Sequence, residues 1–128
     1  MNFVRQEKVD GCAVACYAML IGMSYDAALG VLHPEPSESH ETSNEVLLQK
    51  LTDAGFTIMP KTRRPLSELR NAVLVVRYEI GGSMFMHTVV WDAEHQTVLD
   101  PYDARPLAEY QEGLCMAFEA TRRDPSSD

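Results

Sequence analysis

The chain has 128 residues, of which 45% are hydrophobic and 23% are charged. This balance is typical of a globular protein of one domain, so we expect a single domain over residues 1–121 and a disordered tail over residues 122–128. The formal charge of −8 argues against a phosphate-binding surface, because nucleic-acid recognition needs an excess of Lys and Arg. We therefore predict no nucleic-acid partner.

The lengths of the hydrophobic runs and the number of cysteines indicate the cellular compartment. No apolar run approaches the ~20 residues of a membrane helix, and the first residues lack the apolar stretch of a signal peptide. Three cysteines, an odd number without an export signal, are typical of free thiols in a reducing compartment. We therefore expect a soluble, cytoplasmic protein with no membrane partner and with a thiol available for chemistry.

The first half of the chain has helical patterns. Residues 12–21 are apolar almost all round and rich in Ala, which predicts a buried helix that Gly22 ends. Ser24 is the predicted N-cap of a second helix, which runs to about Leu32. After a polar loop over residues 33–43, the apolar positions of residues 44–53 share one face and predict a third helix.

The second half of the chain has the period of strands. Residues 72–80 and 84–91 are apolar segments joined by Gly81, Gly82 and Ser83, which predicts a β-hairpin. Shorter strands are expected over residues 56–59, 97–100 and 114–120, and short helices over residues 65–69 and 106–110. Helices followed by antiparallel strands predict an α+β fold, with N-terminal helices packed on a C-terminal antiparallel sheet.

Cys12 is the first candidate for chemistry. It lies at the predicted start of a helix, where unpaired N–H groups and the positive end of the helix dipole stabilise a thiolate. Nucleophilic catalysis by cysteine needs that thiolate. Taken alone, the position is more typical of a packed core cysteine, since free cysteines are among the most buried residues.

His87 and Asp100 are the candidates that accompany Cys12. The histidine shares a strand face with Phe85 and Val89, where an imidazole is costly unless it is paired or functional. Taken singly, this histidine is more typical of the core and Asp100, before a proline, of a turn. In this order, on an early helix and two adjacent strands, the three residues predict a nucleophile, its general base and the acid that orients the base.

Gln6 precedes Cys12 by six residues and can offer its side-chain amide beside the backbone N–H of Cys12, forming a two-donor oxyanion hole. Cys16 and Cys115 are expected to be packing residues. A zinc site of Cys12, Cys16 and a histidine is the metal alternative, but no second pair of ligands appears, so we predict no metal and no other cofactor. The remaining histidines are expected to be solvated: His33, His40 and His95.

Together these motifs resemble a known family. Gln6, Cys12 and Cys16 with the Ala-rich helix, then MHTVVWD at residues 86–92 and VLDPYD at residues 98–103, are similar to motifs of the bacteriocin-processing peptidases. These are papain-like cysteine peptidases that usually form the N-terminal domain of ABC exporters and remove double-glycine leaders. The resemblance continues through PLAEY at residues 106–110 to the closing strand, so it covers most of the chain.

The resemblance implies a papain-like fold and matches four residues to family roles. Gln6 corresponds to the oxyanion-hole glutamine, Cys12 to the nucleophile, His87 to the base and Asp100 to the orienting acid. The family commonly has Gly directly after the nucleophile, whereas this chain has Ala13. We expect no transporter segment in these 128 residues, so the double-glycine leader is not carried over as the substrate.

The expected activity is that of a cysteine peptidase or isopeptidase that acts by thiolate acyl transfer on a peptide or protein substrate. The same groups also serve deamidases and acyltransferases, and these remain alternatives. The alternative from another class is an inactive papain-like domain that binds a peptide or partner protein in the cleft. The residue after the nucleophile, Ala13, motivates this second interpretation.

Overall fold

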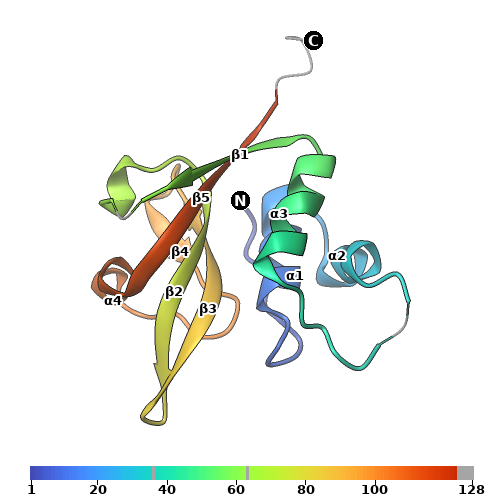
Figure 1. The fold of residues 1–128 in the computed structure, drawn as a ribbon, viewed down its shortest axis with the longest axis horizontal. Coiled ribbons are helices and arrows are strands. Elements are labelled where there is room, and N and C mark those ends of the chain that lie inside the picture. The colour runs from blue at the N-terminus through green and yellow to red at the C-terminus, as the bar shows by residue number, and fades with distance from the viewer. Residues whose placement is uncertain (36, 63, 124–128) are drawn as a thin grey trace.

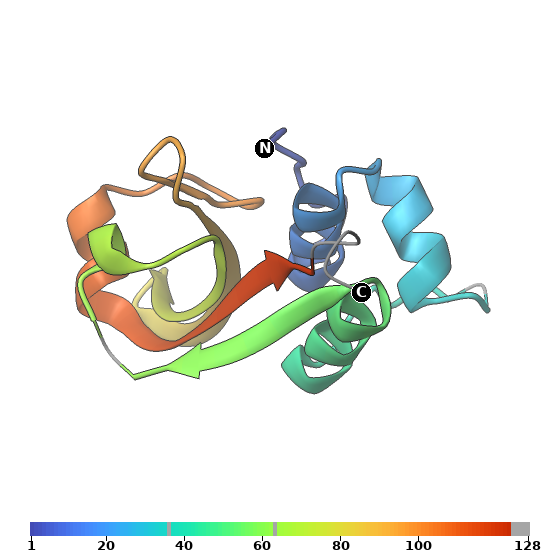
Figure 2. The ribbon, with the colours of Figure 1, turned by 90° about the horizontal axis from the view of Figure 1, so that it is seen from above.

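Helices from the first half of the chain pack against an antiparallel sheet from the second half (Figure 1). This computed structural model describes residues 1–35, 37–62 and 64–123. The arrangement is the predicted α+β class, with the N-terminal helices on one side of the sheet. Figure 2 shows this separation from above, with the helices on one side and the curved sheet on the other.

The N-terminal helices begin and end where the sequence predicted. They are α1 (Cys12–Ile21), α2 (Tyr25–Leu32) and α3 (Asn44–Asp53). The hydroxyls of Ser24 and Ser43 cap α2 and α3 by accepting a backbone N–H of the first turn. Gly22 closes α1 at a φ of 89°, which only glycine adopts at no steric cost. Local signals therefore define all of these boundaries except the start of α1.

The sheet has the strand order β1-β5-β2-β3-β4. Its strands are β1 (Phe56–Lys61), β2 (Ala72–Ile80), β3 (Ser83–Asp92), β4 (Thr97–Leu99) and β5 (Leu114–Arg122). The predicted hairpin is the β2–β3 pair, and Gly81 and Gly82 at its turn both have positive φ, as a two-residue hairpin turn of this kind requires. A 3₁₀ turn, η1 (Leu66–Glu68), and the helix α4 (Leu107–Gly113) complete the fold.

Some elements run further than predicted because distant strands pair with them. β1 continues through Pro60, which a strand at the edge of a sheet tolerates because no ladder bond needs its N–H. Arg122 ends β5, and its guanidinium donates to the carbonyl of Ile21. Arg123 also bonds through its backbone N–H to Gly55. Both arginines were predicted in the tail, whereas residues 124–128 of that tail lie outside the described residues.

Hydrophobic residues fill both faces of the central strands. Val73 and Val90 face the helical cluster around α1, whereas Leu74 and Val89 belong to a second cluster with η1 and α4. The strands β2 and β3 are therefore buried on both sides over this region. This packing holds β3 rigidly beside α1, which is where the candidate site lies.

Candidate active site

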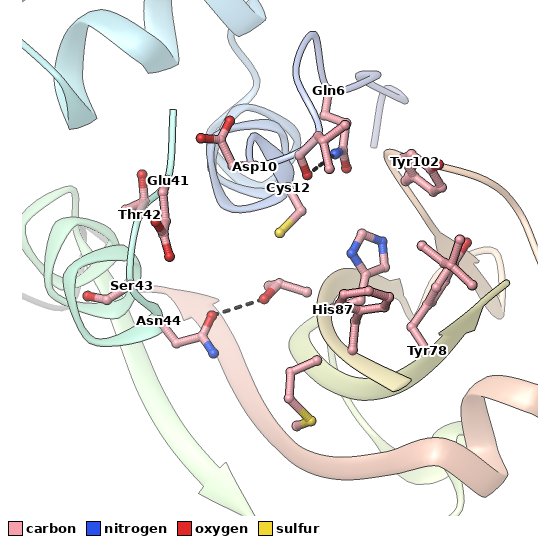
Figure 3. A pocket seen from close by; sticks show the side chains of 15 residues that line it. Gln6, Asp10, Cys12, Glu41, Thr42, Ser43, Asn44, Tyr78, His87 and Tyr102 are labelled. Atoms are coloured by element: carbon pink, nitrogen blue, oxygen red, sulfur yellow. Dashed lines mark hydrogen bonds between the residues drawn. The ribbon is translucent and has the colours of Figure 1, made fainter. Parts of the chain in front are cut away.

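Three predicted residues come together from three separate elements. Cys12 opens α1, His87 lies in the middle of β3, and Asp100 directly follows β4. The Nε2 atom of His87 is 2.8 Å from Oδ1 of Asp100. Figure 3 shows the sulfur of Cys12 beside the same ring, and the thiol and the imidazole are close enough to shift each other's pKa. The imidazole thus lies between the thiol and the carboxylate.

Asp100 is a buried carboxylate, 3% exposed, with a full set of donors. Its Oδ1 accepts from His87 and from the backbone N–H groups of Tyr102 and Asp103, and its Oδ2 accepts from the hydroxyl of Tyr110 at 2.7 Å. Burial raises the pKa of Asp100, but the bonds from His87 and Tyr110 outweigh it and lower the pKa below its usual value. The carboxylate therefore stays ionised beside the ring.

The thiol and the imidazole shift each other's pKa. Burial raises the pKa of Cys12, but hydrogen bonding and charge from His87, followed by contacts with Thr88, lower it below the ordinary value. Burial lowers the pKa of His87, but the bonds to Asp100 and Cys12 raise it to about 9. Both shifts favour the charged forms, a thiolate beside an imidazolium.

Aromatic residues that were not predicted as site residues enclose this pair. The ring of Tyr78 lies edge-on to the imidazole with centroids 4.5 Å apart, and Tyr102 approaches it at 6.2 Å. The hydroxyl of Tyr110 donates to Asp100 and accepts the backbone N–H of Arg105. The resemblance over residues 106–110 was the only sequence signal for Tyr110, because a lone tyrosine has no signature of its own.

Gln6 lines the same cleft as Cys12, but its amide does not point as predicted. Its Nε2 donates to the carbonyls of Lys8 at 2.9 Å and Val9 at 3.0 Å, which uses both amide hydrogens. Its Oε1 is buried with no hydrogen-bond partner among the described residues. The tight loop before α1 turns these two carbonyls toward the amide, so that both donors are used within the loop, and the oxyanion role of Gln6 stays a prediction.

In this chain a glycine, Gly11, lies directly before Cys12 rather than after it. A Cβ at Gly11 would collide with the hydroxyl of Tyr25, so this position has no room for a side chain. Ala13, by contrast, is 1% exposed and packs within the helical core, away from the solvent. The N–H groups of the first turn, including that of Cys12, have no acceptor inside the helix and remain as donors for an anion.

The predictions for two single residues, His40 and Cys115, were wrong. His40 was expected in solvent but is buried, with its Nδ1 atom 2.6 Å from the hydroxyl of Tyr25. Cys115 was expected to pack but is exposed. The register between β2 and β5 shifts at this point, so that Val75 pairs with Met116 and Val76 with Leu114. Cys115 is the extra residue of this bulge and turns outward.

The candidate triad opens into a cleft of about 620 Å³. One wall is largely apolar and comes from the hairpin and the loop after β4: Ile80, Phe85, Met86 and Tyr102. The opposite wall carries Asp10 and residues 41–44. The hydroxyl of Thr88 donates to Oδ1 of Asn44 across the floor of the cleft at 3.0 Å (Figure 3). The volume of the cleft is within the usual range of ligand-binding sites.

The described residues contain neither a metal-binding cluster nor a single membrane-spanning helix. Among them, no group of three or more His, Cys, Asp or Glu side chains could hold a metal ion. No single helix in the same residues is long and apolar enough to cross a membrane, although α1 and α2, bent by 111°, reach that length and composition together. Comparisons with protein families, curated proteins and solved structures found no match for this chain.

Proposed function

We propose that this chain is a cysteine hydrolase that acts by acyl transfer on a peptide or amide bond. The observation that carries the proposal is the position of His87 between the sulfur of Cys12 and the carboxylate of Asp100, at the mouth of this cleft. A helix start lowers the pKa of a thiol, and the buried carboxylate keeps the ring oriented. The same set of residues supports the resemblance to the papain-like, bacteriocin-processing peptidases.

The chemistry follows from these positions. The Cys12 thiolate attacks the carbonyl carbon, a C–S bond forms, and the electron pair moves to the carbonyl oxygen, where the backbone N–H of Cys12 stabilises it. The imidazolium of His87 then protonates the leaving nitrogen as the C–N bond breaks, which leaves a thioester. Neutral His87 next takes a proton from water and the resulting hydroxide attacks the thioester. The C–S bond then breaks, which releases the carboxylic acid and restores the Cys12 thiolate beside the His87 imidazolium.

The lining of the cleft supports a substrate class, and the free cysteines support a cellular compartment. A cleft with one apolar wall supports a polypeptide substrate, with peptidase or isopeptidase action as the leading reaction. Deamidase and acyltransferase reactions share the thioester and differ in the leaving group or in the acceptor. Cys12, Cys16 and Cys115 are all free, which supports a reducing compartment such as the cytoplasm.

The test is the pH dependence of alkylation of Cys12 by iodoacetamide. Because His87 lowers the pKa of Cys12, we expect rapid labelling of Cys12 to persist at pH values below those at which an ordinary cysteine ionises. His87→Ala should return the rate to that of an ordinary buried thiol, and Cys12→Ala should abolish both this labelling and any hydrolysis. Hydrolysis should decline as the pH rises through about 9, where His87 loses its proton.

The matched control is His95→Ala, which removes an exposed histidine bonded to Asp92 and far in sequence from Cys12. This variant should keep the labelling profile of the wild type. Fast labelling confined to Cys16 or Cys115 would contradict the assignment of Cys12 as the nucleophile. Mass mapping of the modified peptide distinguishes the three thiols.

A papain-like domain that binds a peptide without cleaving it is the second candidate. The hydrogen bonds of Gln6 favour it, because both amide hydrogens are used within its own loop and only the backbone donor remains for an oxyanion. In that case Cys12 would resist electrophiles at neutral pH while the purified protein still bound peptides. Alkylation of Cys12 therefore separates the two candidates.

A further inference from the structure

One edge of β3 has no strand partner near the candidate triad. β2 pairs with β3 along its whole length, from Ser83 to Trp91. β4 is short and pairs only with Val90, Trp91 and Asp92 on the other edge. Among the described residues, the remainder of that edge, residues 83–89, therefore lacks a strand beside it.

The backbone of Thr88 shows which peptide groups face this edge. Its carbonyl accepts from the thiol of Cys16 in α1 at 3.4 Å and therefore points away from β2. Backbone groups alternate between the two edges of a strand with a period of two, and the register with β2 is uninterrupted. The N–H and C=O groups of Met86 and Met84 therefore also point away from β2, along the same edge.

The side chains of this segment are unusual for an unpaired edge. Met84, Phe85 and Met86 are consecutive and are 61%, 53% and 60% exposed, and they lie on the hairpin arm that extends beyond the helices (Figure 1). Proteins normally protect an exposed edge with charges, prolines or bulges. An apolar, open edge that runs to a nucleophile is instead what a docking strand requires.

We propose that the open edge of β3 binds an extended, apolar segment of the polypeptide substrate by strand addition, with main-chain hydrogen bonds to Met86 and Met84. This inference rests on the proposed function. Met86 lies two residues, or about 7 Å, before Thr88, and both residues line the same cleft as Cys12. A chain paired with Met86 therefore carries its next peptide groups past Cys12.

The cleft favours a single chain over a second copy of the protein. Met86 forms one wall, and residues 41–44 form the opposite wall of the same cleft. An extended chain beside Met86 would lie within this cleft, whereas the sheet of another copy would meet α3 and the loop before it. Ile80 and Phe85 line the apolar wall and would contact apolar side chains of the bound segment.

The experiment compares a peptidyl and a small electrophile on Cys12. The probes are acetyl-Leu-Leu-Ala chloromethyl ketone and iodoacetamide. Met86→Pro removes the outward N–H without removing a ladder bond, and Met86→Ala is the matched control that keeps this N–H. We expect the proline variant to react with the peptidyl probe about three- to tenfold more slowly than the alanine variant, as the loss of one hydrogen bond implies, while iodoacetamide rates agree.

Met84→Pro and Met84→Ala repeat the comparison two residues further from His87, in case proline at position 86 disturbs the fold. Equal peptidyl rates within both pairs would overturn docking at this edge while Cys12 still reacted with iodoacetamide. Absence of that reaction in the wild type would overturn the proposed function instead. A dimer in sedimentation that Met84→Pro dissociates would assign the edge to a second copy and overturn the proposal.

Discussion

The orientation of His87 depends on how firmly Asp100 is held, and Tyr110 is the side chain that holds it. The tyrosine donates to Oδ2 of Asp100 at 2.7 Å and accepts the backbone N–H of Arg105 at 2.8 Å. It touches neither the thiol nor the ring, so it is a positioning residue. Its hydroxyl joins the loop after β4 to α4, which fixes the carboxylate from the side opposite His87.

Tyr110→Phe should destabilise the protein by about 1–3 kcal/mol, because it leaves buried groups of Asp100 and Arg105 without a partner. It should also raise the pKa of Asp100, since the tyrosine lowers it, and so weaken labelling of Cys12 at low pH. Urea unfolding and the alkylation profile measure the two effects. Tyr17→Phe is the control, because the Tyr17 hydroxyl makes no hydrogen bond within the described residues, and an equal loss in both variants would contradict this role.

At the scale of elements, the start of α1 is determined by packing rather than by a capping side chain. Gly11 is the N-cap but offers no side-chain hydrogen bond, and the hydroxyl of Tyr25 occupies the space beside it. Tyr25 in turn binds His40 in the loop before α3. The position of Cys12 is thus coupled to the loop that forms one wall of the cleft.

Gly11→Ala should therefore destabilise the protein by about 1–3 kcal/mol, as expected when a methyl group enters a filled space. Gly30→Ala is the matched control within α2, since nothing lies within 4 Å of a Cβ there. It should stabilise the protein by about 0.5–1 kcal/mol, because alanine favours a helix over glycine. Denaturant titration measures both, and a Gly11→Ala variant as stable as Gly30→Ala would refute the steric argument.

At the scale of the whole molecule, the three cysteines differ in the solvent exposure of their thiols. Cys115 is exposed, Cys12 is partly buried at the cleft, and Cys16 is fully buried within the helical core. Burial also raises the pKa of Cys16 well above its ordinary value. The protein therefore carries a reactive thiol and a protected thiol on adjacent turns of one helix.

In native protein at about neutral pH, Cys12 should react first, Cys115 more slowly, and Cys16 only when the molecule unfolds globally. The rate at Cys16 should rise with denaturant in step with the global unfolding equilibrium, as followed by mass spectrometry. Cys12→Ala, which retains the other two thiols, shows whether labelling at Cys16 depends on prior modification of Cys12. Rapid labelling of Cys16 without denaturant would show that α1 opens locally.

The sequence predicted the features of the fold that depend on neighbouring residues, but not those that depend on distant strands. Helix ends at Gly22 and Ser24 were predicted because the signal lies within a few residues of the boundary. The bulge at Cys115 and the full length of β5 were not, because they arise from pairing with strands distant in the chain. Local rules contain no information about such partners.

The sequence by itself determined the α+β class, most element boundaries and the order of Cys12, His87 and Asp100, since these follow from periodicity, capping and residue type. Only the tertiary structure decided that the imidazole lies between thiol and carboxylate, that the amide of Gln6 bonds within its own loop, and that β3 has an open edge. These features depend on hydrogen-bond partners and on space. Both are set by how distant segments pack, and therefore lie beyond local sequence.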